Sequence, residues 1–439
     1  MERACFSSAQ DVARRPMSGG PVALFLPHER TEGFFFMASE CRSYGIMTVR
    51  SAAHRETAPA SGEDNGLVVS SMRGLSYYDP QWDELLDQIQ YNDELLTLIF
   101  YDQYCTQPLE SVGLYTTISR DGPQGITLRT NSSGAETNKV CAFCSAPVIA
   151  ATFNMELAYE MGHALGQEMI TNGYTGWYAP GLNIHRTAFS GRNFEYYSED
   201  PLLSGKMAAR VVSGAGDCGV MSYIKHFALN DNDTNRANVC VWANEQAMRE
   251  IYLRSFEICV KEARMTIDYI ADEEGTHATK TMRACTALMT SYNYIGATFS
   301  GGSYALLEDT LRGEWGFTGA IISDMTGANT TGTSWRRDQM VRAGNDMTLW
   351  IMQINAIDTT SATVQWRMRD AVHNIAYALA NSNAMQGVAP GSIAYYTMSP
   401  WAIWLLVANI VIDAFVLAMI AYIIVRLVRS RRHPELYKH

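Results

Sequence analysis

Apolar and polar positions along the chain follow two different spacings. From about Tyr77 onward, some segments carry apolar residues three and four positions apart, as a helix does, and NMELAYEMGHALGQEMITNG (154–173) is the clearest of them. Its residues Leu157, Met161 and Leu165 share one face, and Gly173 is a stop signal. The pattern predicts a helix that buries this face.

Short apolar runs lie between the helical segments, and each run ends in polar, ionisable or aromatic residues. The runs are GWYAPGLNIHR (176–186), VMSYIKHFALN (220–230), ALMTSYNY (287–294), GAIISDM (319–325) and AGNDMTLW (343–350). Buried strands that alternate with helices are typical of a parallel sheet. Polar chemistry at the C-terminal ends of such strands is the arrangement of a barrel enzyme. We therefore expect an α/β fold with a (β/α)8 TIM-type barrel over residues 77–386.

The residues before this region give a weaker pattern. GFFFMASECRSYGIMTVRSA (33–52) alternates as a pair of strands would, and AAHRETAPASGEDNG (52–66) is polar and contains Pro and Gly, as loops do. Neither segment makes a complete domain. We interpret residues 1–76 as the remnant of a preceding module plus a linker.

A long apolar segment follows the expected barrel. After a linker at 387–400 comes WAIWLLVANIVIDAFVLAMIAYIIV (401–425). As a helix it extends about 37 Å at about 1.5 Å per residue, enough to cross a bilayer with tilt. Asp413 near its centre costs on the order of 3 kcal/mol, which the surrounding Leu, Ile, Val and Phe residues outweigh. The sequence predicts one transmembrane helix, with the lipid bilayer as a partner.

The two flanks of this helix differ in charge. No Asp, Glu, Lys or Arg lies between Asp370 and Asp413, whereas the tail at 426–439 is basic. Its cations are Arg426, Arg429, Arg431, Arg432 and Lys438. The positive-inside rule places the tail in the cytoplasm and the barrel outside, in a single-pass protein of the cell membrane. Asn409 and Asp413 lie about one turn apart, so we expect their face to meet another helix.

The composition and net charge of the chain limit which kinds of partner molecule it can bind. With 439 residues, 47% hydrophobic and 18% charged, the chain can bury a large core without disulfides or metals. Its formal net charge of -11 argues against nucleic acid as a partner, because that would need basic patches. Cys141 and Cys144 form a C-x-x-C, but no second pair stands at zinc-ligand spacing, so we assign no metal and no cofactor.

Four polar stretches carry the candidate chemistry. They are SRDGPQG (119–125), GRNFEYYSEDP (191–201), KHFALNDNDTNR (225–236) and GAIISDM (319–325). Together with MTSYN and LRGEWGFTG, they closely resemble glycoside hydrolase family 3, the family of many β-glucosidases. The resemblance runs from about residue 77 to about 386, and the six motifs recur in the family's order.

The resemblance implies a retaining β-glycosidase and gives individual residues roles. Asp324 stands where the family keeps the nucleophile that forms a covalent glycosyl-enzyme. The residues implied to surround the sugar are Asp121, Arg192, Lys225, His226, Tyr292 and Arg236. Charged side chains suit this task because they form strong hydrogen bonds to hydroxyl groups. The Tyr292 phenol is expected within reach of the Asp324 carboxylate.

Each of these residues also has a structural interpretation when taken alone. An isolated Asp beside glycines is often a turn residue, and a lone Arg is often a solvated surface charge. Their common order favours the site. Glu195, Glu199 and Asp200 are different, because EYYSEDP is expected to brace Arg192 or to cap the next helix rather than to catalyse.

The sequence departs from the family pattern after the barrel. Family members usually continue into an α/β sandwich domain that supplies the general acid, whereas here a linker and an apolar helix follow. Some relatives have the sandwich first and the barrel last. We therefore expect this chain to be the barrel of that reversed-order, membrane-anchored type, truncated at its N-terminus, with the general acid in a missing domain.

A second departure concerns the sugar. Members that act on N-acetylglucosamine can carry a Gly-His-Gly-Asp sequence after KHF, but this chain reads KHFALNDND. The resemblance therefore favours an exo-acting β-glucosidase that hydrolyses small β-glucosides.

Two other classes of function compete with this interpretation. A non-catalytic, membrane-anchored sugar-binding or scaffold protein would share the barrel and lack the acid. A phosphate-handling barrel enzyme would need a Gly-rich anion loop late in the barrel, and the sequence has none. The sugar-binding protein is therefore the main alternative.

Overall fold

The computed structural model describes most of the chain. The described residues are 55–92, 95–100, 104–130, 136–272, 274–325, 337–349, 357–385, 400–432 and 436. The strand pair expected at 33–52 lies outside them. The described part of the loop expected at 52–66 contains neither helix nor strand. The chain divides into two units, Met1–Ser392 and Ile393–His439.

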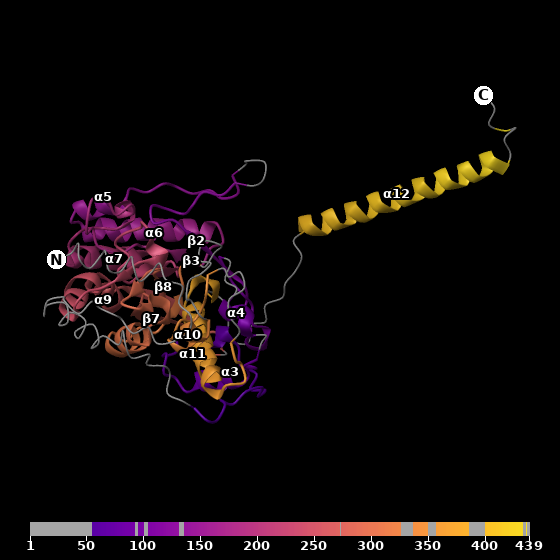
Figure 1. Cartoon of the computed structure of the whole chain (residues 1–439). Helices are drawn as coiled ribbons and strands as arrows, with labels where there is room; N and C mark the ends of the chain where they lie inside the picture. Colours follow the sequence, from indigo (N-terminus) through magenta and orange to yellow (C-terminus); the bar gives the residue numbers. More distant parts are fainter. Residues whose placement is uncertain are drawn as a thin grey trace, which may run out of the picture. The chain divides into compact units, whose positions relative to one another are not determined.

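A six-stranded sheet lies at the centre of the first unit (Figure 1). In spatial order its strands are β1 (Cys105–Thr106), β2 (Thr117–Asp121), β3 (Gly176–Tyr178), β4 (Met221–Phe227), β8 (Ala287–Thr290) and β11 (Ala320–Ile322). β2 to β11 run parallel, and β1 pairs antiparallel to β2. Four of the five apolar runs thus form parallel strands, and the fifth adds a parallel bridge between Met347 and Ile322.

β3, β4, β8 and β11 are buried at every residue, which explains why these strands are mostly apolar, whereas β2 is only partly buried. Trp177 and Leu288 belong to a core cluster on one face, and Tyr178 and Met289 to a cluster on the other. The first cluster includes residues of α5 (Ala146–Ala151), α6 (Met155–Thr171), α7 (Pro201–Asp217) and α9 (Arg254–Glu262). The second includes residues of α3 (Gln81–Asp87), α4 (Leu96–Phe100) and α11 (Ala362–Ala380).

The predicted helix at 154–173 is α6. Asn154 caps it by accepting hydrogen bonds from the N–H groups of residues 156 and 157, and Gly173 follows it with φ +72°. The predicted face is wrong by one position at its start, because Leu157 is 42% exposed whereas Ala158 is buried. The buried face packs on α7 so closely that a Cβ on Gly162 would lie 2.0 Å from the Val211 carbonyl oxygen.

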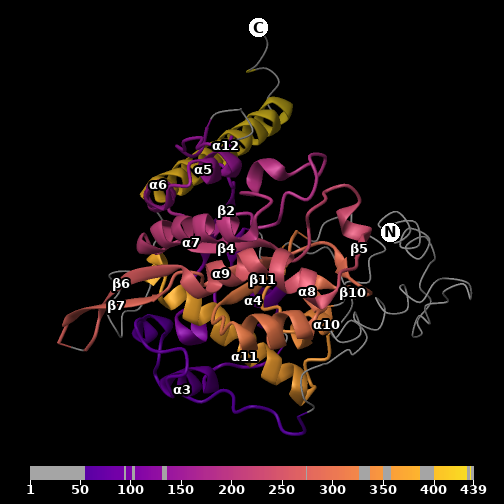
Figure 2. The ribbon, with the colours of Figure 1, turned by 90° about the vertical axis from the view of Figure 1, so that its left-hand side faces the viewer.

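The expected closed barrel of eight parallel strands is only partly present in the described residues, where five strands run parallel and the sheet does not close. Between β4 and β8 in sequence, the chain instead forms an antiparallel hairpin of β6 (Arg264–Ile270) and β7 (His277–Arg283). Figure 2 shows this hairpin projecting from the body. The coarser expectation of a barrel-like α/β fold is confirmed.

The remaining elements are short. The strands β5 (Cys240–Val241), β9 (Tyr294–Ile295) and β10 (Thr298–Phe299) form a three-stranded sheet. The other helices among the described residues of this unit are η1 (Val69–Met72), η3 (Glu110–Val112), η4 (Asn193–Glu195), η5 (Arg236–Asn238), α8 (Glu245–Ala247), η6 (Met248–Tyr252), η7 (Ser300–Gly302), η8 (Ala305–Glu314), α10 (Arg337–Arg342) and η10 (Asn383–Met385).

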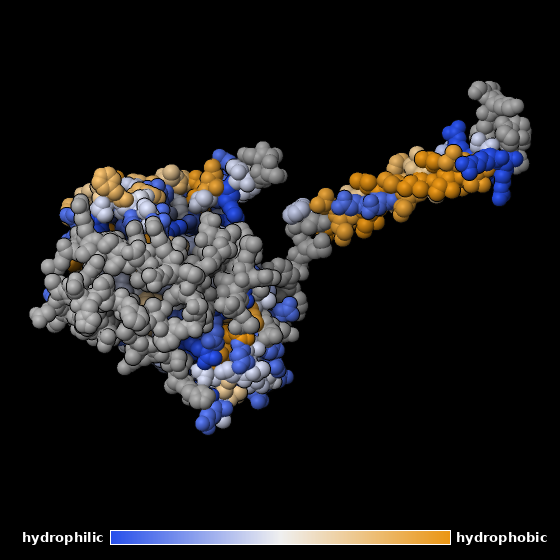
Figure 3. Space-filling view, in the orientation of Figure 1, coloured by the Kyte–Doolittle hydropathy of each residue, from blue (hydrophilic) through white to orange (hydrophobic). Residues whose placement is uncertain are grey.

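The second unit contains one long helix, α12 (Pro400–Arg432). Its segment Ile403–Arg432 is long and apolar enough to cross a membrane, with a mean hydropathy of 2.5. Figure 3 shows apolar surface along most of this helix. The helix thus extends beyond the predicted 401–425, into the basic residues that follow.

A buried polar network anchors β11 from behind. Asp346 accepts hydrogen bonds from the Ile321 N–H at 2.7 Å and the Asn374 amide at 2.8 Å, and its Oδ2 lies 2.7 Å from Arg312 Nη2. The Tyr77 hydroxyl donates to Asn374 Oδ1 at 2.6 Å. The network therefore ties β11 to α11 and to η8.

We expect Asp346→Ala to lower the free energy of unfolding by about 3 kcal/mol or more, because Arg312 stays buried without its closest carboxylate. Urea unfolding of the detergent-solubilised chain measures this change. Asp338→Ala is the matched control, since Asp338 pairs with Arg342 on the surface and its loss should cost about 1 kcal/mol or less. Equal losses for the two variants would contradict the anchoring role.

Candidate active site

The C-terminal ends of the parallel strands bring the predicted site residues together. Asp121 ends β2, Lys225 and His226 lie in β4, and Asp324 follows β11. Arg192 precedes the turn η4, Tyr292 follows β8, and Arg236 opens η5. Because neighbouring parallel strands end at the same edge, residues about two hundred positions apart meet there.

Asp324 lies buried at this edge. Its Oδ1 accepts a hydrogen bond from the Met325 N–H at 2.7 Å. Its Oδ2 lies 3.7 Å from His226 Nε2 and 4.0 Å from Arg236 Nη1, and no described residue donates a hydrogen bond to it. Burial raises the pKa of Asp324 above its usual range, although Arg236, Arg192, the Met325 N–H and Lys225 oppose that rise.

His226 is buried next to this carboxylate. Burial, and after it the cations Arg192, Lys225 and Arg236, hold the pKa of His226 well below its ordinary value. The imidazole is therefore neutral near pH 7, and its contact with Asp324 is not an ion pair. The Tyr196 hydroxyl lies 3.4 Å from its Nδ1.

Lys225 is 3% exposed and is matched by two carboxylates. Its Nζ lies 2.7 Å from Asp121 Oδ1 and 3.6 Å from Glu195 Oε2. Asp121 is 45% exposed, and although burial raises its pKa, Lys225 and the Gly122 N–H outweigh that effect and keep the pKa low. Asp121 is thus an ionised acceptor at the mouth of the site.

Consecutive residues of a regular strand face opposite sides, yet Lys225 and His226 both belong to the site. The register of β4 against β8 explains this. Ile224 pairs with Leu288 but Phe227 pairs with Thr290, so β4 has one extra residue where Lys225 and His226 lie. Such bulges redirect side chains and are common beside active sites.

Arg192 is held by Glu195, whose Oε1 accepts from Arg192 Nε. Glu195 is 1% exposed and contacts both Arg192 and Lys225, while Asp200 caps α7 through the Leu202 N–H. These contacts confirm that Glu195 and Asp200 have structural roles, as the sequence suggested. The sequence did not predict that Glu195 also forms an ion pair with Lys225, because the two residues are thirty positions apart.

Tyr292 and Arg236 lie together beside Asp324. The Arg236 guanidinium stacks over the Tyr292 ring, 4.5 Å from its centroid. The phenol donates to the Met325 carbonyl oxygen, in the main chain next to Asp324. Asp233, also missed from the sequence, lies 3.3 Å from Arg236 and 3.8 Å from Arg192, and its i, i+3 spacing to Arg236 was the available signal.

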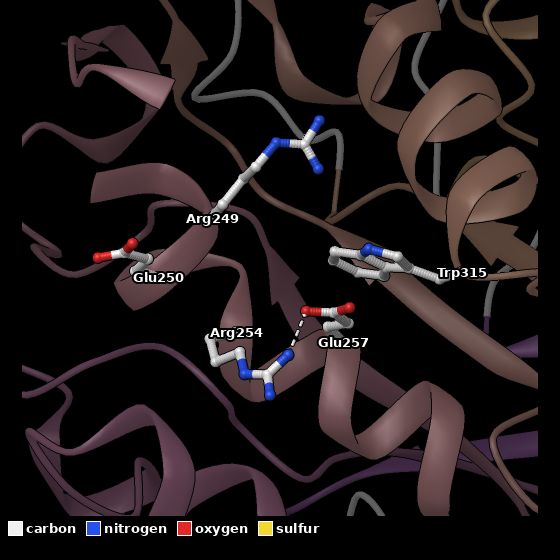
Figure 4. A pocket seen from close by; sticks show the side chains of 5 residues that line it. All are labelled: Arg249, Glu250, Arg254, Glu257 and Trp315. Atoms are coloured by element: carbon white, nitrogen blue, oxygen red, sulfur yellow. Dashed lines mark hydrogen bonds and ion pairs between the residues drawn. The ribbon is translucent and has the colours of Figure 1, made fainter. Parts of the chain in front are cut away.

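A pocket of about 370 Å³ lies elsewhere, lined by Arg249, Glu250, Arg254, Glu257 and Trp315 (Figure 4). None of these is a predicted site residue. Its charges neutralise one another, since Arg254 pairs with Glu257 and Arg249 with Glu314.

Among the described residues, no group of three or more His, Cys, Asp and Glu could hold a metal ion, and Cys141 and Cys144 are both exposed. The strand-end cluster remains the candidate active site.

Fold and site together define the class as a barrel-like α/β protein with a charged cluster at its strand ends. Residues 133–365, more than half of the chain, match the family model described as the glycosyl hydrolase family 3 N terminal domain. The chain belongs to glycosyl hydrolase family 3.

Individual proteins that are similar in sequence to this chain are named as glycosidases. The chain is 31% identical over 316 residues to β-glucosidase B of Emericella nidulans, covering 70% of this chain and 34% of that protein. It is 35% identical over 238 residues to an exo-α-(1→6)-L-arabinopyranosidase of Bifidobacterium longum, covering 53% of this chain and 29% of that protein. The chain thus spans about a third of the length of these curated relatives.

A solved structure is similar as well. β-Glucosidase 3B of Thermotoga neapolitana in complex with α-D-glucose aligns with a TM-score of 0.57 and 30% identity. The alignment covers 70% of this chain and 43% of that protein.

Proposed function

We propose that the chain is the nucleophile-bearing part of a retaining, exo-acting β-glycosidase that hydrolyses small β-glucosides. The observation that carries this proposal is the buried carboxylate of Asp324 at a strand end, with Oδ2 free of hydrogen bonds from the described residues. A retaining glycosidase needs such a carboxylate to attack the anomeric carbon. The similar proteins include a β-glucosidase and an arabinopyranosidase. They therefore support the hydrolysis of glycosides more strongly than they support glucose as the sugar that is released.

The neighbouring residues suit a clamp for the sugar ring. Asp121 is an ionised acceptor, Lys225 and Arg192 are cationic donors, and neutral His226 offers one ring N–H. These groups are already fixed by Glu195 and by one another, so little side-chain entropy remains to be lost when a hydroxyl binds. Tyr292 and Arg236 are proposed to border the same ring.

The general acid is proposed to come from another domain. Among the described carboxylates of the cluster, Asp121 binds Lys225, Glu195 binds Arg192 and Lys225, and Asp233 lies between two arginines. An ionised, cation-paired carboxylate is a poor proton donor. The same observation favours a second candidate function, a non-catalytic sugar-binding protein.

We propose further that α12 anchors the protein in the cell membrane, with its basic end in the cytoplasm and the family 3 domain outside. The support is the apolar length of Ile403–Arg432 and the Arg residues at its C-terminal end. Asn409 and Asp413 give the helix a polar face in the apolar span, and we propose a second membrane helix as its partner.

Asp324→Ala should abolish hydrolysis of an aryl β-glucoside with an activated leaving group, since such a substrate needs the nucleophile but little help from an acid. Added azide should partly restore cleavage and give a product of inverted configuration, because it occupies the space of the lost carboxylate. Asp338→Ala, on the surface, should keep wild-type activity. Sugar binding without any cleavage by the wild-type chain would instead support the non-catalytic candidate.

The acid limb of kcat/KM against pH should report the ionisation of Asp324. Arg236 lowers the pKa of this carboxyl, so Arg236→Met should raise the pKa and move the acid limb to higher pH. Arg249→Met, which removes a cation from the separate pocket, is the control and should leave the limb in place. If the acid limb of Arg236→Met is unchanged or moves to lower pH, the acid limb does not report the ionisation of Asp324, and the proposed role of Asp324 as the nucleophile is contradicted.

Helix pairing can be tested by cysteine crosslinking in native membranes. Asn409→Cys and Asp413→Cys should each crosslink to another membrane helix, because a polar face is unfavourable against lipid. Val411→Cys points about 160–200° away from both and should not crosslink. Crosslinking with equal yield at all three positions, or at none, would refute the pairing.

A further inference from the structure

A second buried carboxylate, Asp231, lies close in sequence to His226 and Arg236, and it forms no hydrogen bond or ion pair with the other side chains of the cluster among the described residues. Its side chain is almost withdrawn from solvent, at 5% exposure. Its Oδ1 accepts a hydrogen bond of 2.7 Å from the Ile184 N–H. No Lys, Arg or His of the described residues forms a salt bridge with it. A carboxylate is costly to bury, so a position that retains one needs an explanation.

Ile184 belongs to the segment 180–186 after β3, which we name the clamp loop. The clamp loop is bound to the main chain of the two β4 residues at the site. The Leu182 N–H donates to the Lys225 carbonyl at 2.7 Å. The Asn183 side chain accepts from the His226 N–H at 2.9 Å and donates to the His226 carbonyl at 3.1 Å. The orientation of both Lys225 and His226 therefore depends on where this loop lies.

The clamp loop also contacts the turn that carries Arg192. The His185 Nε2 lies 2.9 Å from the Asn193 carbonyl oxygen and 2.8 Å from that of Tyr196. The His185 N–H donates to the Ser198 carbonyl at 3.1 Å. One loop thus touches the segments that supply two of the three cations of the site, Lys225 and Arg192, and Asp231 binds near the middle of that loop.

We propose that Asp231 is a positioning residue for the sugar-binding groups, acting through the Ile184 N–H and the clamp loop. A hydrogen bond to a charged acceptor is about twice as strong as one between neutral groups, which suits the one contact through which Asp231 adds to the other hydrogen bonds of the loop. Burial raises the pKa of Asp231 to about 7, partly offset by the Ile184 N–H and by Arg186. The inference rests on the proposed function only in taking the clustered cations to bind a sugar.

The variants separate the hydrogen bond from the charge. Asp231→Leu removes the acceptor at similar volume, whereas Asp231→Asn keeps an acceptor oxygen without the charge. Asp217→Leu is the matched control, because Asp217 also accepts a 2.7 Å hydrogen bond from a main-chain N–H, that of Thr266, away from the clamp loop. If Asp231→Leu does not fold, Asp231→Ala takes its place.

Hydrogen–deuterium exchange of the full chain in detergent gives the first measurement. Asp231→Leu should speed exchange at 181–186 and 225–228 by about tenfold or more, the loss of one hydrogen bond to a charged group. Asp231→Asn, which keeps an acceptor oxygen but loses the charge, should fall between the wild type and Asp231→Leu. Asp217→Leu should change exchange around 264–268 and leave the clamp loop unchanged. Unchanged exchange of the clamp loop in Asp231→Leu, or equal loosening by Asp217→Leu, would overturn the proposal.

Calorimetric binding of D-glucose gives the second measurement. Asp231→Leu should weaken binding by about tenfold or more, and Asp231→Asn, which keeps a neutral acceptor, should weaken it less. Equal loss in both Asp231 variants would overturn the proposal, because the acceptor would then not be the cause. If the wild type binds no glucose while exchange still loosens in Asp231→Leu, the positioning of the loop stands and the proposed function fails.

Discussion

The candidate site is organised around one buried cation. The ammonium group of Lys225 is nearly closed off from water, and a charge in that position is tolerated only with partners of opposite sign. Asp121 from β2 and Glu195 from η4 are those partners, and Glu195 also binds Arg192. The requirement to neutralise one lysine thereby fixes a strand end, a turn and an arginine relative to one another.

The same cations act on the two titratable groups nearest the proposed reaction. Arg192, Lys225 and Arg236 lower the pKa of His226 and also oppose the rise that burial causes in the pKa of Asp324. One set of charges therefore favours a neutral imidazole and an ionised carboxylate at the same pH. In the proposed reaction, the ionised carboxylate is the form that could attack the anomeric carbon.

Much of this fold was predictable because the parallel strands β3, β8 and β11 are buried and so read as short apolar runs, as Ala320–Ile322 does. The helix α6 was predictable from its period, but Leu157 and Ala158 lie at the boundary of the buried stripe, and only the close approach of α7 decides between them. The hairpin β6–β7 was not foreseen. The cluster itself followed from motifs, whereas the contacts of Asp231 with Ile184 and of Asp233 with Arg192 join residues about forty or more positions apart, which no local pattern encodes.

The hairpin β6–β7 has a consequence for how the chain folds. β4 and β8 are neighbours in the sheet but are separated by some sixty residues, and parallel pairs of that kind close slowly because a long loop must be ordered first. Within that interval, seven residues of β6 pair with seven of β7 around a short turn, contacts that form in about microseconds in isolated hairpins. By folding the intervening chain back on itself, the hairpin shortens the effective loop. The element that interrupts the barrel pattern is therefore placed to speed assembly of the strands that carry Lys225 and, one strand further along, Asp324.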